Sequence, residues 1–183
     1  MAEFLWIFWS FSLLGWVLER LFAAVTRSPR RRRRCLLLLP LCPVYGLGMA
    51  AVLALPPSLR SGWLLYLWGG LTATSVEYIY HWWGETFLGV SFWDYTGVFG
   101  NFCGRVCLPF SLAWGLLLFP AVYLAPLILE IAGHVPIIVT WCLMLVFAAD
   151  AVCSLRFLAV THDLEALRAA VWPVWGCPVS YTH

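Results

Sequence analysis

Apolar stretches separated by short polar turns are the feature that most constrains how this chain can fold. They cover about residues 4–25, 35–55, 62–83, 106–131 and 137–160. A helix that crosses the hydrocarbon core of a bilayer needs roughly 20 mainly apolar residues, so each stretch is long enough to span it. Charged residues make up 11% of the chain, whereas a soluble domain has about 25%. The sequence therefore predicts an all-α polytopic transmembrane helical bundle of about five spans, which forms a single domain over residues 1–160.

The arginines predict how this bundle is oriented. The chain has no lysine, and the run Arg30–Arg34 lies between the first two apolar stretches. Basic loops stay on the cytoplasmic side of a membrane, so the N-terminus is expected outside and the C-terminus inside. The loop over residues 84–105 is then cytoplasmic, and residues 161–183 form a short cytoplasmic or interfacial tail. A basic run can also bind nucleic acid, but its place between two apolar stretches favours contact with anionic lipid instead.

Two prolines near the start of the second apolar stretch predict an interruption of its helix. Pro40 and Pro43 each lack the backbone N–H that a helix interior needs. Either the helix begins at Pro43, with the prolines in its first turn, or the backbone there is unwound or re-entrant. Unwound backbone survives at membrane depth only where it is buried in protein or lines a wet cavity. The candidate residues of this broken helix are Cys42, Pro43, Tyr45 and Gly46.

Ionisable residues in and beside the apolar stretches are the main functional candidates. A charge at the centre of a membrane helix costs roughly 2.5–3.5 kcal/mol on insertion scales, so it is usually paired, and it often marks function. Glu77, His81 and Glu85 follow one another at intervals of one helical turn. Such a stripe suits a proton relay or a substrate site, and it equally suits a structural polar network. The candidates for substrate or proton handling are Glu19, Glu77, His81, Glu85, Asp150 and Arg105.

The partners of these charges are open to alternative predictions. Glu19 could be an interfacial residue paired with an arginine. Asp150 has no arginine nearby in the sequence, so Arg105 is a candidate partner for it. Glu77 and Glu85 lie roughly 12 Å apart along a helix axis, too far to bind one ion together. The sequence therefore predicts no metal site, and it predicts no cofactor.

The loop over residues 84–105 has the composition of a folded cap. It contains Trp93-Asp94-Tyr95 and then a Gly-Asn-x-x-Gly-Arg turn, whose glycines permit close backbone approach. Arg105 offers a bidentate donor for a carboxylate or a phosphate, and an Asp94–Arg105 ion pair is the simplest structural expectation. The candidate cap residues are Trp93, Asp94, Tyr95, Asn101 and Gly104.

An ordered set of short motifs resembles a known family. The set consists of Gly15-Trp16-x-x-Glu19, Cys42-Pro43-x-Tyr45-Gly46-x-Gly48, Glu77-Tyr78, Trp93-Asp94-Tyr95, Asn101, Gly104-Arg105, Trp114-Gly115 and Asp150. It resembles the CmpB-type family of small bacterial membrane proteins, which are catalogued as ABC-transporter permeases, and it extends over about residues 4–160. The chain departs from the family at Thr96 and at Val98-Phe99-Gly100, where the family often has a serine and a Pro-Phe pair.

The resemblance implies a multi-pass protein of the bacterial cytoplasmic membrane that takes part in transport coupled to a separate ATPase subunit. The chain itself has no Walker motif. About five spans are few for a permease, so a homo-oligomer is expected.

Three functions are consistent with the sequence. The first is a transport component, in which buried carboxylates handle substrate or protons and the broken helix lines the path. The second is a membrane-embedded enzyme that acts on a lipid or a membrane-soluble substrate, with carboxylate, histidine and arginine side chains converging near the cytoplasmic face. The third is a non-catalytic membrane partner protein, whose polar groups only hold helices together.

Overall fold

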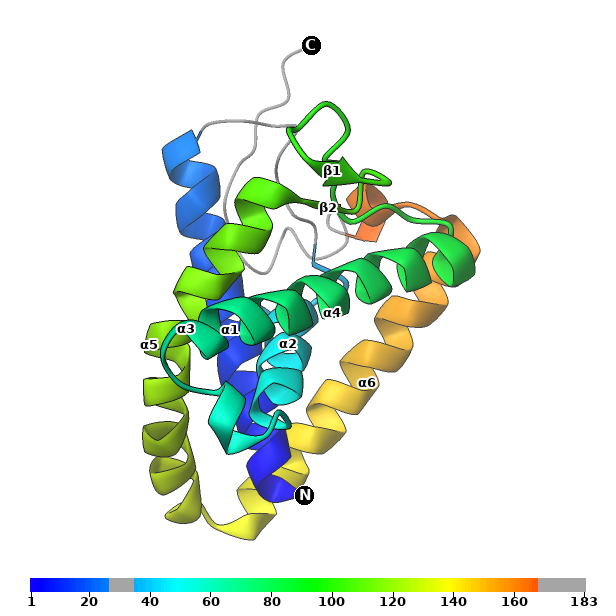
Figure 1. Cartoon of the computed structure of the whole chain (residues 1–183). Helices are drawn as coiled ribbons and strands as arrows, with labels where there is room; N and C mark the ends of the chain where they lie inside the picture. Colours follow the sequence, from blue (N-terminus) through cyan, green and yellow to red (C-terminus); the bar gives the residue numbers. More distant parts are fainter. Residues whose placement is uncertain (27–34, 168–183) are drawn as a thin grey trace.

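The computed structural model describes residues 1–26 and 35–167 (Figure 1). Within these ranges, three helices are long and apolar enough to cross a membrane: α1 (Ala2–Thr26), α5 (Leu108–Gly133) and α6 (Ile137–Thr161). Almost all of the remaining regular structure is helical as well, so the predicted all-α membrane fold is confirmed. The total number of spans and their orientation stay predictions.

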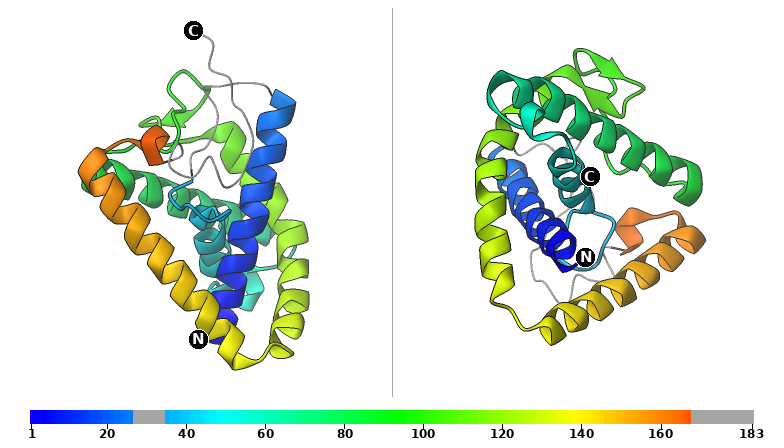
Figure 2. Two further views of the ribbon diagram at one scale, coloured as in Figure 1. Left: turned by 180° about the vertical axis from the view of Figure 1, so that it is seen from behind. Right: turned by 60° about the horizontal axis from the view of Figure 1, so that its bottom comes forward.

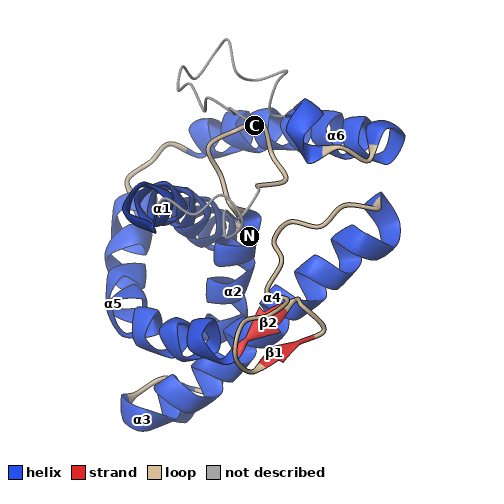
Figure 3. Ribbon diagram, turned by 90° about the horizontal axis from the view of Figure 1, so that it is seen from above, coloured by secondary structure: helices blue, strands red, loops and turns tan. Residues whose placement is uncertain are grey.

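The third apolar stretch forms one continuous helical run. It contains α3 (Gly62–Leu64), the π-helical turn η3 (Leu65–Gly69), α4 (Gly70–Trp83) and the second π-helical turn η4 (Gly84–Leu88). Gly70 and Gly84 at the junctions both have right-handed helical dihedral angles, so the run is not interrupted. It ends at Gly89, whose left-handed φ of 66° is typical of a glycine after a helix. The run crosses α1 and α5 rather than lying alongside them (Figures 1 and 3).

The second apolar stretch is helical only in its second half. Helix α2 extends over Pro43–Leu53, and residues 35–42 have an irregular backbone with bends at residues 36–40. The helix thus begins at Pro43, which is the first of the two alternatives given for this stretch. The physical reason is local, because Cys42 is held in an extended conformation before Pro43, and Pro43 is suited to the first turn of a helix. At 1.5 Å per residue, α2 is only about 16 Å long, roughly half of the thickness of a bilayer core.

Glycines bring α1 and α2 into close contact. A Cβ atom on Gly15 would lie 2.2 Å from Cγ of Tyr45, and one on Gly46 would lie 2.4 Å from the carbonyl oxygen of Phe8. Small residues of this kind let membrane helices approach closely, and packing is their main source of attraction in lipid. The α1–α2 pair forms one apolar core with α5, which includes Val52 and Leu118.

The loop that follows η4 is folded. Its strands β1 (Asn101–Phe102) and β2 (Val106–Cys107) pair in an antiparallel hairpin. Phe92 and Tyr95 of this loop are almost fully buried in a second apolar core, which also contains Leu164 of the tail. The loop is called the cap below, over residues 89–107. Residues 168–183, most of the predicted tail, lie outside the described part of the chain.

Helix α6 packs loosely against the rest of the molecule. It leans away from α1 and α5 along most of its length (Figures 1 and 2), and most of its side chains are exposed. At one end, Trp6 Nε1 donates a hydrogen bond to Thr140 Oγ1 at 3.1 Å. At the other end, His162 Nδ1 lies 2.6 Å from the carbonyl oxygen of Leu88. These polar contacts act together with apolar packing, in which Leu158 is buried and Phe147 contacts the rings of Phe8 and Trp9.

Candidate functional site

Asp150, in the middle of α6, binds the irregular segment that precedes α2. Its Oδ1 accepts a hydrogen bond from the backbone N–H of Leu38 and its Oδ2 accepts one from Leu39, both at 3.1 Å. Ser154 Oγ also donates to Oδ1, at 3.2 Å. Asp150 is only 9% exposed. Its carboxylate is the acceptor for two backbone N–H groups that have no helical partner. The predicted pairing of Asp150 with Arg105 is wrong, because Arg105 contacts other groups.

Glu77 lies at the junction of α4, α5 and the cap. Its side chain is fully buried. Tyr95 OH donates a hydrogen bond to Oε1 at 3.2 Å, and Trp114 Nε1 donates one to Oε2 at 2.6 Å. The carboxylate thus joins three elements that are distant in the sequence. These contacts fit a structural polar network, which is one of the two alternatives for this residue.

Glu85 connects His81 to Arg105 at the edge of the cap. Its Oε2 accepts a hydrogen bond from Arg105 Nε at 2.7 Å, and its Oε1 lies 3.1 Å from His81 Nε2. Arg105 Nη1 also donates to Tyr78 OH at 2.8 Å. The predicted Asp94–Arg105 ion pair is therefore wrong, because the guanidinium group of Arg105 binds Glu85 instead. The Glu85 and Arg105 side chains are 35% and 22% exposed, so this cluster reaches the surface of the molecule.

The environment of Glu85 favours its charged form. Partial burial alone would raise the pKa of Glu85, but the hydrogen bond from Arg105 and the contact with His81 together lower it below its usual value. The Glu85 hydrogen bond in turn raises the pKa of Arg105. The two residues therefore form a stable ion pair outside the predicted spans.

His81 lies behind this ion pair and is almost fully buried. Its Nε2 also lies 3.2 Å from Ser91 Oγ, and Ser91 Oγ itself donates to the carbonyl oxygen of Trp93. Among the described residues, Nδ1 of His81 has no hydrogen-bond partner although it is buried. A neutral imidazole with its proton on Nε2 is the form that satisfies these contacts. The predicted contact between His81 and Glu85 is present. Glu77, the third residue of the predicted polar stripe, instead accepts hydrogen bonds from Tyr95 and Trp114.

The candidate cap residues hold the backbone of the loop. Asp94 Oδ1 accepts the N–H of Thr96 at 2.7 Å. Hydrogen bonding from the Thr96 side chain, and next from this backbone N–H, lowers the pKa of Asp94 below its ordinary value. Asn101 Nδ2 donates to the carbonyl oxygen of Val98 at 3.0 Å, and Asn101 Oδ1 accepts the N–H of Gly104. Trp93 Nε1 donates to the carbonyl oxygen of Arg105 at 2.7 Å. These bonds are typical of a structural turn network.

Glu19 is bound by Tyr45 and lines a cavity. Tyr45 OH donates a hydrogen bond to Glu19 Oε1 at 2.5 Å, and the Tyr45 ring lies 4.8 Å from the ring of Trp114. Arg20, the neighbour of Glu19, stacks over the Trp16 ring at 4.9 Å. Tyr45, a candidate of the broken helix, thus links α2 to α1 and α5.

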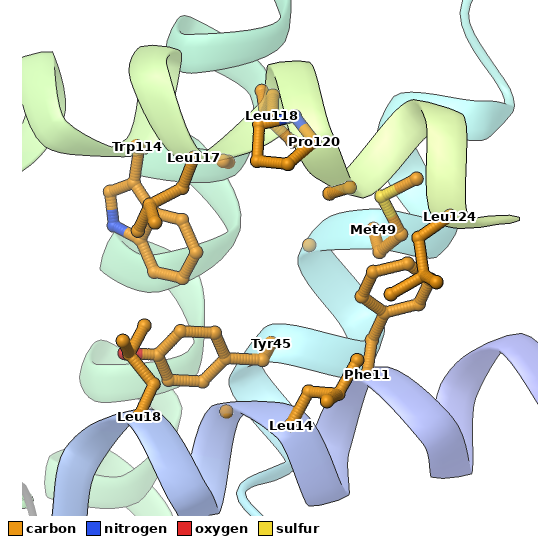
Figure 4. Close-up of a pocket in the computed structure, with 14 residues that line it drawn as sticks. Phe11, Leu14, Leu18, Tyr45, Met49, Trp114, Leu117, Leu118, Pro120 and Leu124 are labelled. Carbon is orange, nitrogen blue, oxygen red and sulfur yellow. The ribbon is translucent and has the colours of Figure 1, made fainter. Parts of the chain in front are cut away.

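Two adjoining cavities lie between α1, α2 and α5. The larger, shown in Figure 4, has a volume of about 230 Å³, and the smaller has a volume of about 150 Å³. They share the lining residues Leu18, Tyr45, Trp114 and Leu117. Glu19 lines the smaller one, whereas the cluster of His81, Glu85 and Arg105 borders neither. Within residues 1–26 and 35–167, no three histidine, cysteine, aspartate or glutamate side chains lie close enough together to hold a metal ion.

The sequence did not identify two important parts of this region. Trp114 appeared only as part of a motif, and nothing in its spacing indicates that it binds Glu77, which is 37 residues away. The backbone amides of Leu38 and Leu39 carry no side-chain signal. The two prolines that flank this segment were the available clue, since they predict donors that lack helical partners.

Apolar helices of membrane-spanning length, with carboxylates buried between them, define an integral membrane protein. Residues 6–155 match the family model described as "Putative ABC-transporter type IV" (CmpB), and the chain belongs to this family. The predicted resemblance is thereby confirmed. No curated protein and no solved structure matches the chain. Family membership associates the chain with membrane transport.

Proposed function

We propose that this chain is the membrane-embedded subunit of a bacterial transporter and that its discontinuous second segment forms part of the transport path. The protein would cross the cytoplasmic membrane several times, with its N-terminus outside and its C-terminus inside. It would assemble as a homo-oligomer and act with a separate ATPase subunit. The observation that carries this proposal is the hydrogen bonding of Asp150 to the irregular backbone of Leu38 and Leu39.

Irregular backbone at membrane depth requires a special environment. It persists only where it is buried in protein or lines a wet cavity. Transporters use such discontinuous helices near the bilayer midplane, where the ends of half-helices and the unwound backbone bind substrates and coupling ions. The short α2 and the irregular residues 35–42 fit this description in length and in position between α1 and α6.

The irregular segment is attached to two different helices. Cys42 donates its backbone N–H to the carbonyl oxygen of Ser12 in α1 at 2.9 Å, while Leu38 and Leu39 bind Asp150 in α6. A shift of α6 relative to α1 would therefore move this segment directly. Protonation of Asp150 would weaken its two backbone bonds, so Asp150 is our candidate for coupling proton binding to this movement.

The enzyme hypothesis has less structural support. It requires Glu77, His81, Asp150 and Arg105 to converge around a pocket. His81 and Arg105 do meet at Glu85, but Glu77 and Asp150 have other partners. The cluster also borders neither of the two cavities described above.

Cysteine accessibility tests whether the irregular segment lines an aqueous path. Leu39→Cys is introduced into a variant that retains only Cys103 of the native cysteines, because Cys103 is exposed in the cap and serves as a positive control. A membrane-impermeant, charged thiol reagent is expected to label Leu39→Cys in native membranes. The matched control is Leu145→Cys on the exposed face of α6, which is expected to face lipid and to stay unlabelled.

One labelling result would contradict the proposed transport path. If Cys103 reacts but Leu39→Cys is as unreactive as Leu145→Cys, the segment is sealed within protein, and its proposed role in a transport path is wrong.

A further inference from the structure

The larger of the two cavities is an apolar space among α1, α2, α4 and α5 (Figure 4). Its described lining contains no charged side chain. The polar side-chain atoms on its walls have partners of their own. Tyr45 OH donates to Glu19. Trp114 Nε1 donates to Glu77. The side chains that line the cavity therefore present hydrocarbon and ring faces to the space.

Gly48 shows that the protein itself does not fill this space. The residue is buried in α2, yet a Cβ atom built on it would meet no neighbouring side chain or helix within 4 Å. Small residues in membrane helices usually let another helix approach, as Gly15 and Gly46 do, but no helix approaches Gly48. Ala73 and Ala121 also line the cavity. Small side chains thus leave a void, whose walls lose dispersion contacts unless something occupies it.

The opening of the cavity is level with the middle of two membrane-spanning helices. Leu14 of α1 and Leu117 of α5 line the cavity and are 43% and 39% exposed, so they form its rim. Leu14 is at the centre of Ala2–Thr26, and Pro120, also on the wall, is at the centre of Leu108–Gly133. The hydrocarbon core of a bilayer is about 30 Å thick, so its centre is about 15 Å from either polar surface. Acyl chains reach this depth, whereas lipid headgroups and bulk water do not.

We propose that the larger cavity binds the end of one acyl chain of a membrane phospholipid, which enters sideways between α1 and α5. An apolar cavity of about 150 Å³ stays dry and binds a small hydrocarbon. This cavity, at about 230 Å³, has room for more. The chain would contact Phe11, Met49 and Leu124, which Figure 4 shows close together on the wall. It thereby completes the packing of α1, α2 and α5 as a structural ligand, whether or not the protein is a transporter.

Photolabelling with a lipid probe tests this site. The full-length protein is reconstituted in nanodiscs of phosphatidylcholine, a small fraction of which carries a diazirine at the end of one acyl chain. Labelled residues are then mapped by peptide mass spectrometry. Phe11 and Met49 are only 7% and 3% exposed, so a chain on the outer surface does not reach them. We expect label on both, in addition to the label that surface lipid places on exposed Leu116 and Leu145.

Two variants fill the cavity from different walls. Gly48→Leu and Ala121→Leu each place a larger apolar side chain in the space. Each is expected to lower the labelling of Phe11 and Met49 by about fivefold or more relative to surface labelling, because a close-packed interior does not admit a second chain. Gly133→Leu is the matched control, since Gly133 is exposed at the end of α5 and a Cβ atom there also meets nothing within 4 Å. It should be labelled like the wild type.

Two results would overturn this lipid site. One is labelling restricted to exposed residues, which would favour another occupant, such as a side chain of a second copy. The other is undiminished labelling of Phe11 and Met49 in either cavity-filling variant, provided that the variant keeps the elution volume and helical content of the wild type. Both results are independent of the labelling of Leu39→Cys, because Leu39 does not line the cavity.

Discussion

The absence of one methyl group allows Tyr45 to reach Glu19. The Tyr45 ring packs directly on the backbone of Gly15, where a Cβ atom would lie 2.2 Å from Cγ of the ring. Because this atom belongs to the body of the ring and not to the end of a flexible chain, the whole ring would have to move. The Tyr45–Glu19 hydrogen bond depends on this contact, and so does the shape of the two cavities that Tyr45 lines.

Gly15→Ala is therefore expected to destabilise the protein by about 1–3 kcal/mol, the usual cost of overpacking a tight contact. The free energy of unfolding can be measured by denaturant titration in detergent micelles. Gly48→Ala is the matched control, because a Cβ atom there would have no neighbour within 4 Å. An equal loss of stability in the two variants would contradict this account of Gly15.

At the scale of single elements, hydrogen bonds contribute to the position of α6 alongside the packing of Leu158 and Phe147. They are the Trp6–Thr140 bond, the Asp150 bonds to residues 38–39, and the contact of His162 with Leu88 just after the helix. In lipid, apolar side chains give little net drive for helix association, so polar contacts of this kind have a larger relative weight. Asp150 is the central one, because two backbone donors depend on it.

Asp150→Ala is expected to lower the free energy of unfolding by about 2–4 kcal/mol, since it leaves two buried N–H groups without an acceptor. Asp150→Asn keeps one acceptor oxygen, so an intermediate loss is expected. Ser154→Ala removes only one side-chain bond and should cost less than about 1 kcal/mol. Denaturant titration of the three variants checks this order. Wild-type stability of Asp150→Ala would show that the N–H groups of Leu38 and Leu39 find other partners.

The cap is an element whose stability should depend on pH. The pKa values of Glu85 and Asp94 are both lowered in the folded protein. Groups of this kind stabilise the fold fully above their ordinary pKa values, about 4.3 and 3.9, and they lose this contribution as the pH falls through the lowered values. The amides of residues 93–105 should therefore exchange faster with solvent as the pH falls below about 4, after correction for intrinsic exchange rates.

A variant carrying both Glu85→Gln and Asp94→Asn is the control for this measurement. Its cap should be less protected at neutral pH, and the protection should change little on acidification. The same steep pH dependence in the double variant would assign the effect to other groups.

At the scale of the whole molecule, α5 and α6 present broad apolar faces with many exposed side chains. Some of these faces contact lipid, and we expect others to contact a second copy. The chain has no Walker motif to bind ATP, whereas its family is associated with ABC transport. Gentle purification from native membranes, followed by mass spectrometry, should yield an ATP-binding-cassette subunit in stoichiometric amounts together with more than one copy of this chain. Recovery of a single copy of this chain with no other protein would contradict both the expected ATPase subunit and the expected homo-oligomer.

The sequence predicted best those features that depend on neighbouring residues. Apolar stretches of sufficient length predicted α1, α5 and α6, and the spacing of His81 and Glu85 predicted their contact. Contacts between distant segments could not be predicted in the same way. Arg105 binds Glu85 and not the predicted Asp94, and only the folded backbone determines which carboxylate is closer to the guanidinium group. Pro40 and Pro43 predicted the break before α2, but not that Asp150 would bind it.

The π-helical turns in the run Gly62–Leu88 have a consequence for insertions and deletions. A π-helical turn holds one residue more than an α-helical turn, so deleting one residue from η3 should convert it into regular α-helix. The residues before η3 would then keep nearly the same face relative to α4, because a π-helical turn holds its extra residue within almost the same rotation as an α-helical turn. The same deletion in η4 should likewise leave Leu88 and the cap after it near their present places. Loss of one residue should thus be tolerated within either π-helical turn, whereas the same loss inside α4 should rotate the two parts of the helix by about 100° relative to each other.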